Sequence, residues 1–260
     1  MEREIRLDIF SSVSVVIPAI DETESLRDSI EIILNTCDHM DINEIFIVVC
    51  ERTTPECLRV INSLIASENK VPVRLYYQAH PGLGAALHEA MQRVKGSHVV
   101  NMAADMDTDP YVIKDMINIA KNHPDAVILA SRWIKGGGFI GYGRMYKLLN
   151  YIFNKMLQIL FLSKVSDLTY GFRFASVDKT LSVKWESRGF SIGMETNLKM
   201  LRLGYKIIEV PAVWRVRNQG DSQNSFFTKL KYMSTVLKVR FASKASIKSD
   251  ISERSLIDGK

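Results

Sequence analysis

Three aspartates at alternate positions, Asp105, Asp107 and Asp109, are the residues of this sequence best suited to chemistry. They follow an apolar run at 98–102 and precede Pro110. In an extended chain alternate side chains share a face, so we expect Asp105 and Asp107 to converge on one cation. Carboxylate oxygens suit Mg²⁺ or Mn²⁺, which also bind substrate phosphates. Helix capping by Asp107 and Asp109 is the competing interpretation, and we assign Asp109 to the cap.

Two further apolar runs also end in acidic residues. Pro18 ends the first run, and Asp21 and Glu22 follow it; Glu51 follows the second run, at 45–49. If both runs are parallel strands, these carboxylates lie at one edge of the sheet, where a nucleoside could bind. The competing interpretations are a helix N-terminus for Asp21 and Glu22 and a solvated turn for Glu51.

A glycine pair, Gly82 and Gly84, precedes a segment with helical spacing. Glycine lets a backbone approach a ligand closely, and the start of a helix attracts phosphate. A Gly-x-Gly pair alone is weak evidence. Because this pair stands directly before the acidic strand, we include both glycines in the candidate nucleotide site.

Short β-branched runs alternate with segments of helical spacing in the first half of the chain. The expected strands lie at 12–17, 45–49, 73–77, 98–102 and 126–130, and the expected helices at about 23–36, 56–67, 84–95 and 110–122. This alternation is typical of an α/β fold with a mostly parallel sheet covered by helices. Ligands of such folds bind at the carboxyl edge of the sheet, where all of these motifs stand.

The second half of the chain predicts longer helices. Glycine-rich residues 136–143 predict a mobile loop. Helices are expected at 144–162, 193–203 and about 224–243, and strand material at 168–176 and 206–217, with Pro211 as an interruption. The polar tail from Ser243 onward is expected to be frayed. We expect one α/β domain over residues 1–222, followed by a basic amphipathic helix and a polar tail over 223–260.

In their order along the chain, the first four motifs resemble the family 2 glycosyltransferases, which have the GT-A fold. The family pattern is a strand with Pro-Ala-x-Asn-Glu, a strand with Asp-Asp-Gly-Ser, a Gly-x-Gly-x-Ala helix start, and a strand with Asp-Ala-Asp. Residues 12–110 contain a segment that corresponds to each of these four motifs, in the same order. The combination is far more specific than any of its parts, and it implies a GT-A fold.

The second half is more narrowly similar to the polyprenyl-phosphate sugar transferases of the dolichol-phosphate type. The similarity covers about residues 12–225. Its most specific motif is Ser-Asp-Leu-Thr-Tyr-Gly-Phe-Arg at 166–173. Other matching elements are Ala130-Ser131-Arg132, the glycine-rich residues 136–143, residues 189–195 and residues 204–211.

Three departures from the family pattern fall at functional places. The first aspartate of Asp-Ala-Asp falls on Ala103, so we expect a shifted metal site that uses Asp105 and Asp107. Residues 50–51 read Cys-Glu instead of Asp-Asp, which leaves one carboxylate. The late Gly-x-Ser-Lys element reads Gly-Asp-Ser-Gln at 220–223 and lacks the lysine.

The resemblance implies an inverting glycosyltransferase that moves a sugar from a nucleoside diphosphate to a polyprenyl phosphate, assisted by Mg²⁺ or Mn²⁺. Arginines would hold the two anionic substrates together, because their forks match phosphate oxygens. The implied catalytic residues are Asp105, Asp107, Arg132 and Arg173. The implied nucleotide-sugar site comprises Pro18, Ala19, Asp21, Glu22, Glu51, Gly82, Gly84, Ala104 and Asp105. The implied acceptor and phosphate site comprises Arg132, Asp167, Thr169, Arg173, Arg215, Arg217 and Ser222.

Two other functions stay open. A hydroxyl acceptor in a glycan or glycolipid would need a general base, for which Glu195 and Asp167 are candidates. We favour structural roles for both: bonding backbone amides for Glu195 and capping a turn for Asp167. Ala103 also fits a non-catalytic nucleotide-sugar-binding homologue. Arg144 and the pair Arg215 and Arg217 are further candidate clamps, for which surface salt bridges are the competing interpretation.

Charge and cysteine content bear on the partners and the compartment. The net charge of +5 and the pI of about 9.0 suit an anionic partner. No nucleic-acid recognition motif appears, so nucleic acid is not expected. The odd number of cysteines predicts free thiols in a reducing compartment. No charge-free apolar stretch is long enough to cross a membrane.

Two helical segments predict contact with a membrane surface. Residues 144–162 carry one polar stripe on an otherwise apolar helix, and residues 224–243 have apolar residues at helical spacing flanked by lysine and arginine. Core packing is the competing interpretation. We predict a cytoplasmic protein bound to the cytoplasmic face of a membrane. Its expected partners are a nucleotide sugar and a lipid acceptor, with a homo-oligomer or an integral membrane protein as further candidates.

Overall fold

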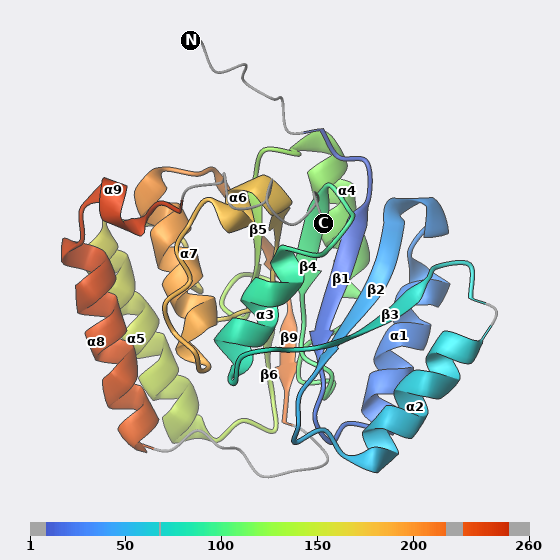
Figure 1. The fold of residues 1–260 in the computed structure, drawn as a ribbon. Coiled ribbons are helices and arrows are strands. Elements are labelled where there is room, and N and C mark those ends of the chain that lie inside the picture. The colour runs from blue at the N-terminus through green and yellow to red at the C-terminus, as the bar shows by residue number, and fades with distance from the viewer. Residues whose placement is uncertain (1–8, 68, 217–225, 250–260) are drawn as a thin grey trace.

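A computed structural model gives the structure of residues 9–67, 69–216 and 226–249 (Figure 1), with the side chains of 226–231 left out. Within these ranges the central sheet has 7 strands in the order β3-β2-β1-β4-β7-β5-β8. The strands are β1 (Val13–Pro18), β2 (Ile42–Val49), β3 (Val73–Tyr77), β4 (His98–Asn101), β5 (Val127–Ser131), β7 (Arg173–Ser176) and β8 (Ile207–Pro211). All pairs are parallel except those of β7, which runs antiparallel to β4 and β5. The predicted α/β fold with a mostly parallel sheet is confirmed.

Helices cover both faces of the sheet. One face carries α1 (Glu24–Thr36), α2 (Pro55–Ala66) and α4 (Val112–Asn122); the other carries α3 (Leu83–Met91), α6 (Val177–Leu181) and α7 (Ser191–Leu203). A short 3-10 helix, η1 (His39–Asp41), leads into β2. In β1, Val15 and Ile17 pack on the first face and Val16 on the second. Burial of both faces explains why the strand reads as a continuous apolar run.

Part of the glycine-rich segment is a strand, so the predicted loop is wrong for residues 138–140. Its residues form β6 (Gly138–Ile140), which pairs in parallel with β9 (Val213–Arg215) in a second, two-stranded sheet. Gly136 and Gly141 have positive φ angles of 94° and 73°, conformations that glycine adopts without strain. The glycines therefore shape the turns around β6.

Two helices stand outside the three layers. Helix α5 (Arg144–Phe161) and helix α8 (Phe226–Phe241) lie side by side against α7 (Figure 1). Leu157 of α5 and Val236 and Val239 of α8 are buried at this contact. The predicted domain boundary at residue 222 lies outside the described residues. None of the described helices has the length and apolar character that crossing a membrane requires.

Helix α5 turns much of its polar stripe toward the protein. Asn150 accepts a hydrogen bond from the indole of Trp133, and Asn154 accepts one from the backbone amide of Leu168. Gln158 donates to the backbone oxygen of residue 165. Apolar residues of α5 face outward instead, with exposed fractions from 47% to 76%: Met145, Leu148, Leu149, Ile152 and Ile159. This inverted arrangement leaves an apolar strip, the α5 strip, on the surface.

The chain beyond α8 is ordered to residue 249. It forms α9 (Lys244–Ile247), and the side chain of Ile247 is buried. Lys184 donates its backbone amide to the backbone oxygen of Ile247, and Ser249 donates its own to Ser182. The predicted fraying from Ser243 onward is therefore wrong for residues 243–249, because these bonds attach them to the segment after α6.

Candidate active site

The loops after β1 and β2 form one unit at the carboxyl edge of the sheet. The Thr53 hydroxyl donates to the backbone oxygen of Ala19 over 3.0 Å and accepts from the backbone amide of Cys50 over 3.0 Å. The backbone amide of Thr54 also donates to Ile20. Sequence reasoning missed Thr53, because a threonine in a turn is common and its partner lies 34 residues away.

The acidic residues of these two loops lie at the carboxyl edge of the sheet. Asp21 and Glu51 are exposed, and Glu22 is half-buried. Oε2 of Glu22 accepts from the backbone amides of Ile20, over 2.7 Å, and Asp21. Burial, followed by the negative charges of Glu22 and Asp21, raises the pKa of the Cys57 thiol to about 12. Both carboxylates therefore lie close to helix α2, and the three cysteines, Cys37, Cys50 and Cys57, are free.

The acidic segment after β4 is a turn and not an extended chain. Met106 has φ of 59°, in the left-handed region that non-glycine residues seldom adopt. Oδ1 of Asp105 accepts from the backbone amide of Asp107 over 3.2 Å. The extended geometry from which the shared face of Asp105 and Asp107 was predicted is therefore wrong. The tight turn keeps the two carboxylates within one short loop, and strain of this kind gathers at functional sites.

Asp107 is held by residues from distant parts of the chain. Its Oδ2 accepts from the indole nitrogen of Trp214 over 3.2 Å. Its backbone oxygen accepts from the backbone amide of Arg215 over 3.2 Å and from the hydroxyl of Tyr170 over 3.5 Å. Strand β9 and the motif around Tyr170 therefore position this loop.

Other predicted residues at this edge of the sheet bond within a turn or pack in the core. Oδ1 of Asp109 accepts from the backbone amide of Tyr111, so Asp109 bonds within the turn before α4, whose N-cap is Tyr111 and not the predicted Asp109. Pro18 ends β1 and is half-buried. Ala19 and Ala104 are buried in the core on the α1 face. Their methyl groups pack against the helices, so the predicted nucleotide contacts of Ala19 and Ala104 would have to use backbone atoms.

Arg132, directly after β5, forms a buried ion pair with Asp167. The Nε and Nη2 atoms of Arg132 donate to the two carboxylate oxygens over 2.7 and 2.9 Å. Burial by itself would raise the pKa of Asp167, but the charge and hydrogen bonds of Arg132 hold it below its usual range. Burial would likewise lower the pKa of Arg132, and Asp167 keeps it above its ordinary value. Both groups are charged at neutral pH.

Asp167 and Thr169 position Arg132 and do not face an acceptor, which corrects the predicted acceptor site. The Asp167 side chain has no exposed surface. The Thr169 hydroxyl donates to Asp167 and accepts from Arg132, Asn150 and Asn154. These contacts use up the polar atoms that a phosphate would need, so only Arg132 of this group can act on one.

Tyr170 lies between the acidic loop and the arginine. The guanidinium of Arg132 sits over its ring, 4.5 Å from the centroid. Burial raises the pKa of Tyr170 well above its ordinary value, and the charges of Asp107, Asp167 and Asp105 act in the same direction. Arg132 opposes them. The acidic loop and Arg132 thus approach the same buried side chain from two strand ends.

Arg173 is enclosed inside the protein, which corrects its predicted role as a phosphate clamp. Its exposed fraction is 1%. Strand β7 places it between β4 and β5, and its guanidinium donates to Thr196 and Asn197 of α7. Burial lowers the pKa of Arg173 to about 10. A phosphate could reach this side chain only by entering the core.

Two of the predicted arginines are exposed. Arg144 begins α5 and Arg215 ends β9. In the described part of the chain neither arginine forms an ion pair, so the competing interpretation as surface salt bridges gains no support. Arg217 and Ser222 lie outside the described residues.

Gly82 and Gly84 serve close packing of two backbone segments. Gly82 has φ of 106°. A Cβ atom on Gly84 would meet the backbone oxygen of Ser187 at 1.9 Å, and one on Gly82 would meet that of Arg188 at 2.4 Å. The amide of Gly84 donates to Arg188. Residues 187 and 188 therefore fill the space that the missing side chains leave, so these two glycines admit a second backbone segment on this side of the helix start.

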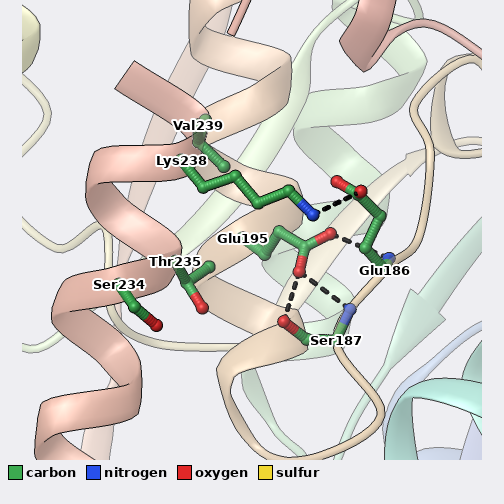
Figure 2. Close-up of a pocket in the computed structure, with 7 residues that line it drawn as sticks. All are labelled: Glu186, Ser187, Glu195, Ser234, Thr235, Lys238 and Val239. Carbon is green, nitrogen blue, oxygen red and sulfur yellow. Dashed lines mark hydrogen bonds and ion pairs between the residues drawn. The ribbon is translucent and has the colours of Figure 1, made fainter. Parts of the chain in front are cut away.

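Glu195 has the structural role favoured from the sequence. Figure 2 shows its carboxylate directed at Glu186 and Ser187. It accepts a hydrogen bond of 2.9 Å from the backbone amide of each. It also accepts from Lys199, which is fully buried. The cleft that these residues line with α8 has a volume of about 210 Å³ and includes none of the predicted nucleotide or metal residues.

The donor set of the acidic loop fits a divalent cation. Asp105 and Asp107 offer carboxylate oxygens, which Mg²⁺ and Mn²⁺ prefer. No cluster of three or more histidine, cysteine or acidic side chains is arranged for a metal among the residues described. A cation held here would take its other ligands from substrate phosphates and water, as Mg²⁺ usually does.

Comparison with known proteins identifies the family. Residues 14–181 match the family "Glycosyl transferase family 2". The chain belongs to this family. The match runs from β1 to α6 and so includes the acidic loop, Arg132 and the Asp167 motif. The predicted family is therefore confirmed.

Family 2 relatives share modest identity with this chain. A dolichol-phosphate mannosyltransferase from Pyrococcus furiosus is 26% identical over 230 residues, which are 87% of this chain and 63% of that protein. An undecaprenyl-phosphate mannosyltransferase from Micrococcus luteus is 22% identical over 219 residues, which are 82% of this chain and 87% of that protein. The chain thus spans less than two thirds of the length of the first of these relatives.

Solved structures with this fold include glucosyl-3-phosphoglycerate synthase from Mycobacterium tuberculosis. Its complex with Mn²⁺, uridine diphosphate and phosphoglyceric acid has a TM-score of 0.64 and 19% identity, and the match covers 90% of this chain and 80% of that one. Its complex with Mn²⁺, UDP-glucose and glycerol 3-phosphate has a TM-score of 0.65. This similarity confirms the GT-A fold.

Proposed function

We propose that this chain transfers a sugar from a nucleoside diphosphate to a polyprenyl phosphate, with inversion at the anomeric carbon. One observation carries the proposal: the acidic loop after β4 and Arg132 after β5, the two strands that flank β7, approach Tyr170 at the carboxyl edge. The loop suits the diphosphate of the donor, and the arginine suits a second anion. The two mannosyltransferase relatives, named for dolichol and undecaprenyl phosphate, support the choice of acceptor.

The reaction is a direct displacement. An oxygen of the acceptor phosphate forms a bond to the anomeric carbon, and the bond from that carbon to the diphosphate breaks. The nucleoside diphosphate leaves with the electron pair. Because the attacking oxygen is already anionic, this chemistry needs no general base. A divalent cation bound at Asp105 and Asp107 would supply charge neutralisation of the leaving diphosphate.

The charges of this chain fit such a reaction. Asp167 and Thr169 fix the guanidinium of Arg132, so it is ordered before a substrate arrives. Arg144 and Arg215 are exposed and can hold further phosphate oxygens. A hydroxyl acceptor is less well served, because Asp167 is ion-paired and Glu195 is bonded to amides and Lys199.

The α5 strip supports the proposed peripheral position on a membrane surface. A helix with outward apolar side chains and basic neighbours suits the interface of a bilayer. Lys147 and Lys155 are exposed beside the strip. Residues 223–260, which contain α8, would add the basic helix predicted from the sequence, so that the lipid acceptor is reached at the bilayer surface.

The test is to incubate the protein with Mg²⁺ or Mn²⁺, a panel of nucleotide sugars and undecaprenyl phosphate, and to measure nucleoside diphosphate release and lipid-linked sugar. We expect turnover with one donor. Asp105→Asn should reduce it by about 100-fold or more, since it removes a charge that acts on the leaving group. The control is Asp109→Asn in the same loop, which keeps an oxygen that accepts from Tyr111 and should retain activity. Absence of turnover with every donor, or equal effects of both variants, would contradict the proposal.

Membrane contact is tested by sedimentation with vesicles that contain anionic phospholipid. We expect the wild-type protein to pellet and the variant Leu148→Ser/Ile152→Ser to stay largely in the supernatant. Ile65→Ser on α2 is the matched control, because Ile65 is also exposed but lies outside the strip. Equal pelleting of the three proteins would exclude the strip as the contact.

A further inference from the structure

Trp214 reaches the acidic loop from a strand 107 residues further along the chain. It lies in β9, half-buried, and Tyr142 packs edge-on against it with ring centroids 4.9 Å apart. Its indole nitrogen donates to Oδ2 of Asp107 over 3.2 Å. An indole N–H is a donor only, so this contact holds one of the two carboxylate oxygens.

The contacts of Asp107 divide between its backbone and its side chain. The hydroxyl of Tyr170 and the amide of Arg215 bind its backbone oxygen, and so fix the turn. Trp214 binds the carboxylate itself. Removing the indole N–H should therefore change the orientation of the carboxylate but leave the path of the loop unchanged.

We propose that Trp214 is a positioning residue for Asp107, and that it orients the carboxylate for a divalent cation carrying a nucleoside diphosphate. The inference rests on the proposed function. Groups that hold a metal ligand from behind commonly change metal affinity or activity by about 10- to 100-fold when they are removed. Tyr142 and the β6–β9 pair keep the indole in place, so its position does not depend on a bound substrate.

The test measures Mn²⁺ binding directly, by the electron paramagnetic resonance signal of free Mn²⁺ in the presence of UDP or of GDP. Trp214→Phe keeps an aromatic ring and removes the N–H. We expect its affinity for Mn²⁺ with the nucleotide to fall by about 10-fold or more, with its melting temperature close to that of the wild type. In turnover assays the Mn²⁺ concentration that gives half-maximal rate should rise by a similar factor.

The matched control is Trp185→Phe. Trp185 also donates an indole hydrogen bond, to the backbone oxygen of Thr180 over 3.0 Å, but it contacts α6 and not the acidic loop. We expect wild-type Mn²⁺ affinity for this variant. Wild-type affinity in Trp214→Phe, or an equal loss in both variants, would overturn the positioning role alone. A wild-type protein that binds no Mn²⁺ with either nucleotide would overturn the cation site of the proposed function as well.

Discussion

Two buried arginines of this protein, Arg132 and Arg173, have opposite surroundings. Arg132 meets the carboxylate of Asp167 in a two-point contact, and its pKa is raised. Arg173 meets the neutral side chains of Thr196 and Asn197, and its pKa is lowered to about 10. Burial by itself lowers the pKa of both guanidiniums, so the opposite shifts come from the partner. The carboxylate of Asp167 orients the guanidinium of Arg132 at the active edge, whereas Arg173 joins β7 to α7.

The same substitution at both sites should separate the two roles most strongly. Arg132→Met leaves Asp167 buried without its counter-ion and should lower the free energy of unfolding by about 3–5 kcal/mol. Arg173→Met removes a charge that has no ionic partner and should cost only about 1–2 kcal/mol, for its two hydrogen bonds. Urea unfolding at pH 7 measures both values. Equal losses would mean that the carboxylate does not distinguish the sites.

The cost at Arg132 should be recovered when its partner is also made apolar. In the double variant Arg132→Met/Asp167→Leu no buried charge is left over, so we expect stability to return to within about 2 kcal/mol of the wild type. Transfer activity should stay lost, because the clamp is gone. The measurement is again urea unfolding, with turnover assayed on the same samples. A double variant as unstable as Arg132→Met would show that packing, and not charge, explains the first result.

Alkaline pH should act on the Arg173 site. The folded pKa of about 10 lies well below the ordinary value of an arginine side chain. Between these values the unfolded chain keeps a proton that the folded chain releases, so this group adds stability as the pH rises above about 10. Relative to Arg173→Met, the wild type should gain about 1 kcal/mol between pH 8 and pH 11. Comparing the unfolding free energies of the two proteins checks this, and a constant difference would contradict it.

The ion pair at the surface between Lys121 and Asp41 should contribute least to the free energy of unfolding. Lys121 and Asp41 lie 2.6 Å apart, with the lysine side chain 45% exposed. Lys121→Met should change the unfolding free energy by less than about 1 kcal/mol, since water screens such pairs. The same urea series measures it. A loss as large as that of Arg132→Met would mean that burial does not decide how much an ion pair of this protein contributes to stability.

The fold and the edge of the site follow from local patterns in the sequence. Strands such as 45–49 and helices such as 110–122 are visible because each carries its own apolar period. Acidic residues directly after strands then place Asp105 and Glu51 at the carboxyl edge. The order of the motifs gave the family, which the match over residues 14–181 confirms.

The contacts that decide the roles could not be predicted, because they join residues far apart in sequence. The partners Arg132 and Asp167 are 35 positions apart. The space over Gly84 is filled by Ser187, to which no local pattern points. Arg173 stood in the most specific motif, yet its burial follows from the place of β7 between β4 and β5, which strand lengths do not reveal.

The place of β7 also has a consequence for how the protein is made. Strands β1 to β4 can pair with one another as they leave the ribosome, since only β4 has a further partner, β7, outside this group. Strand β5 pairs only with β7 and β8 in the described sheet, and β7 is synthesised about 40 residues later. Until then an emerging chain carries a finished half-sheet with one open edge at β4. The acidic loop follows that edge strand, so it reaches its final partners only after the second half of the chain has been added.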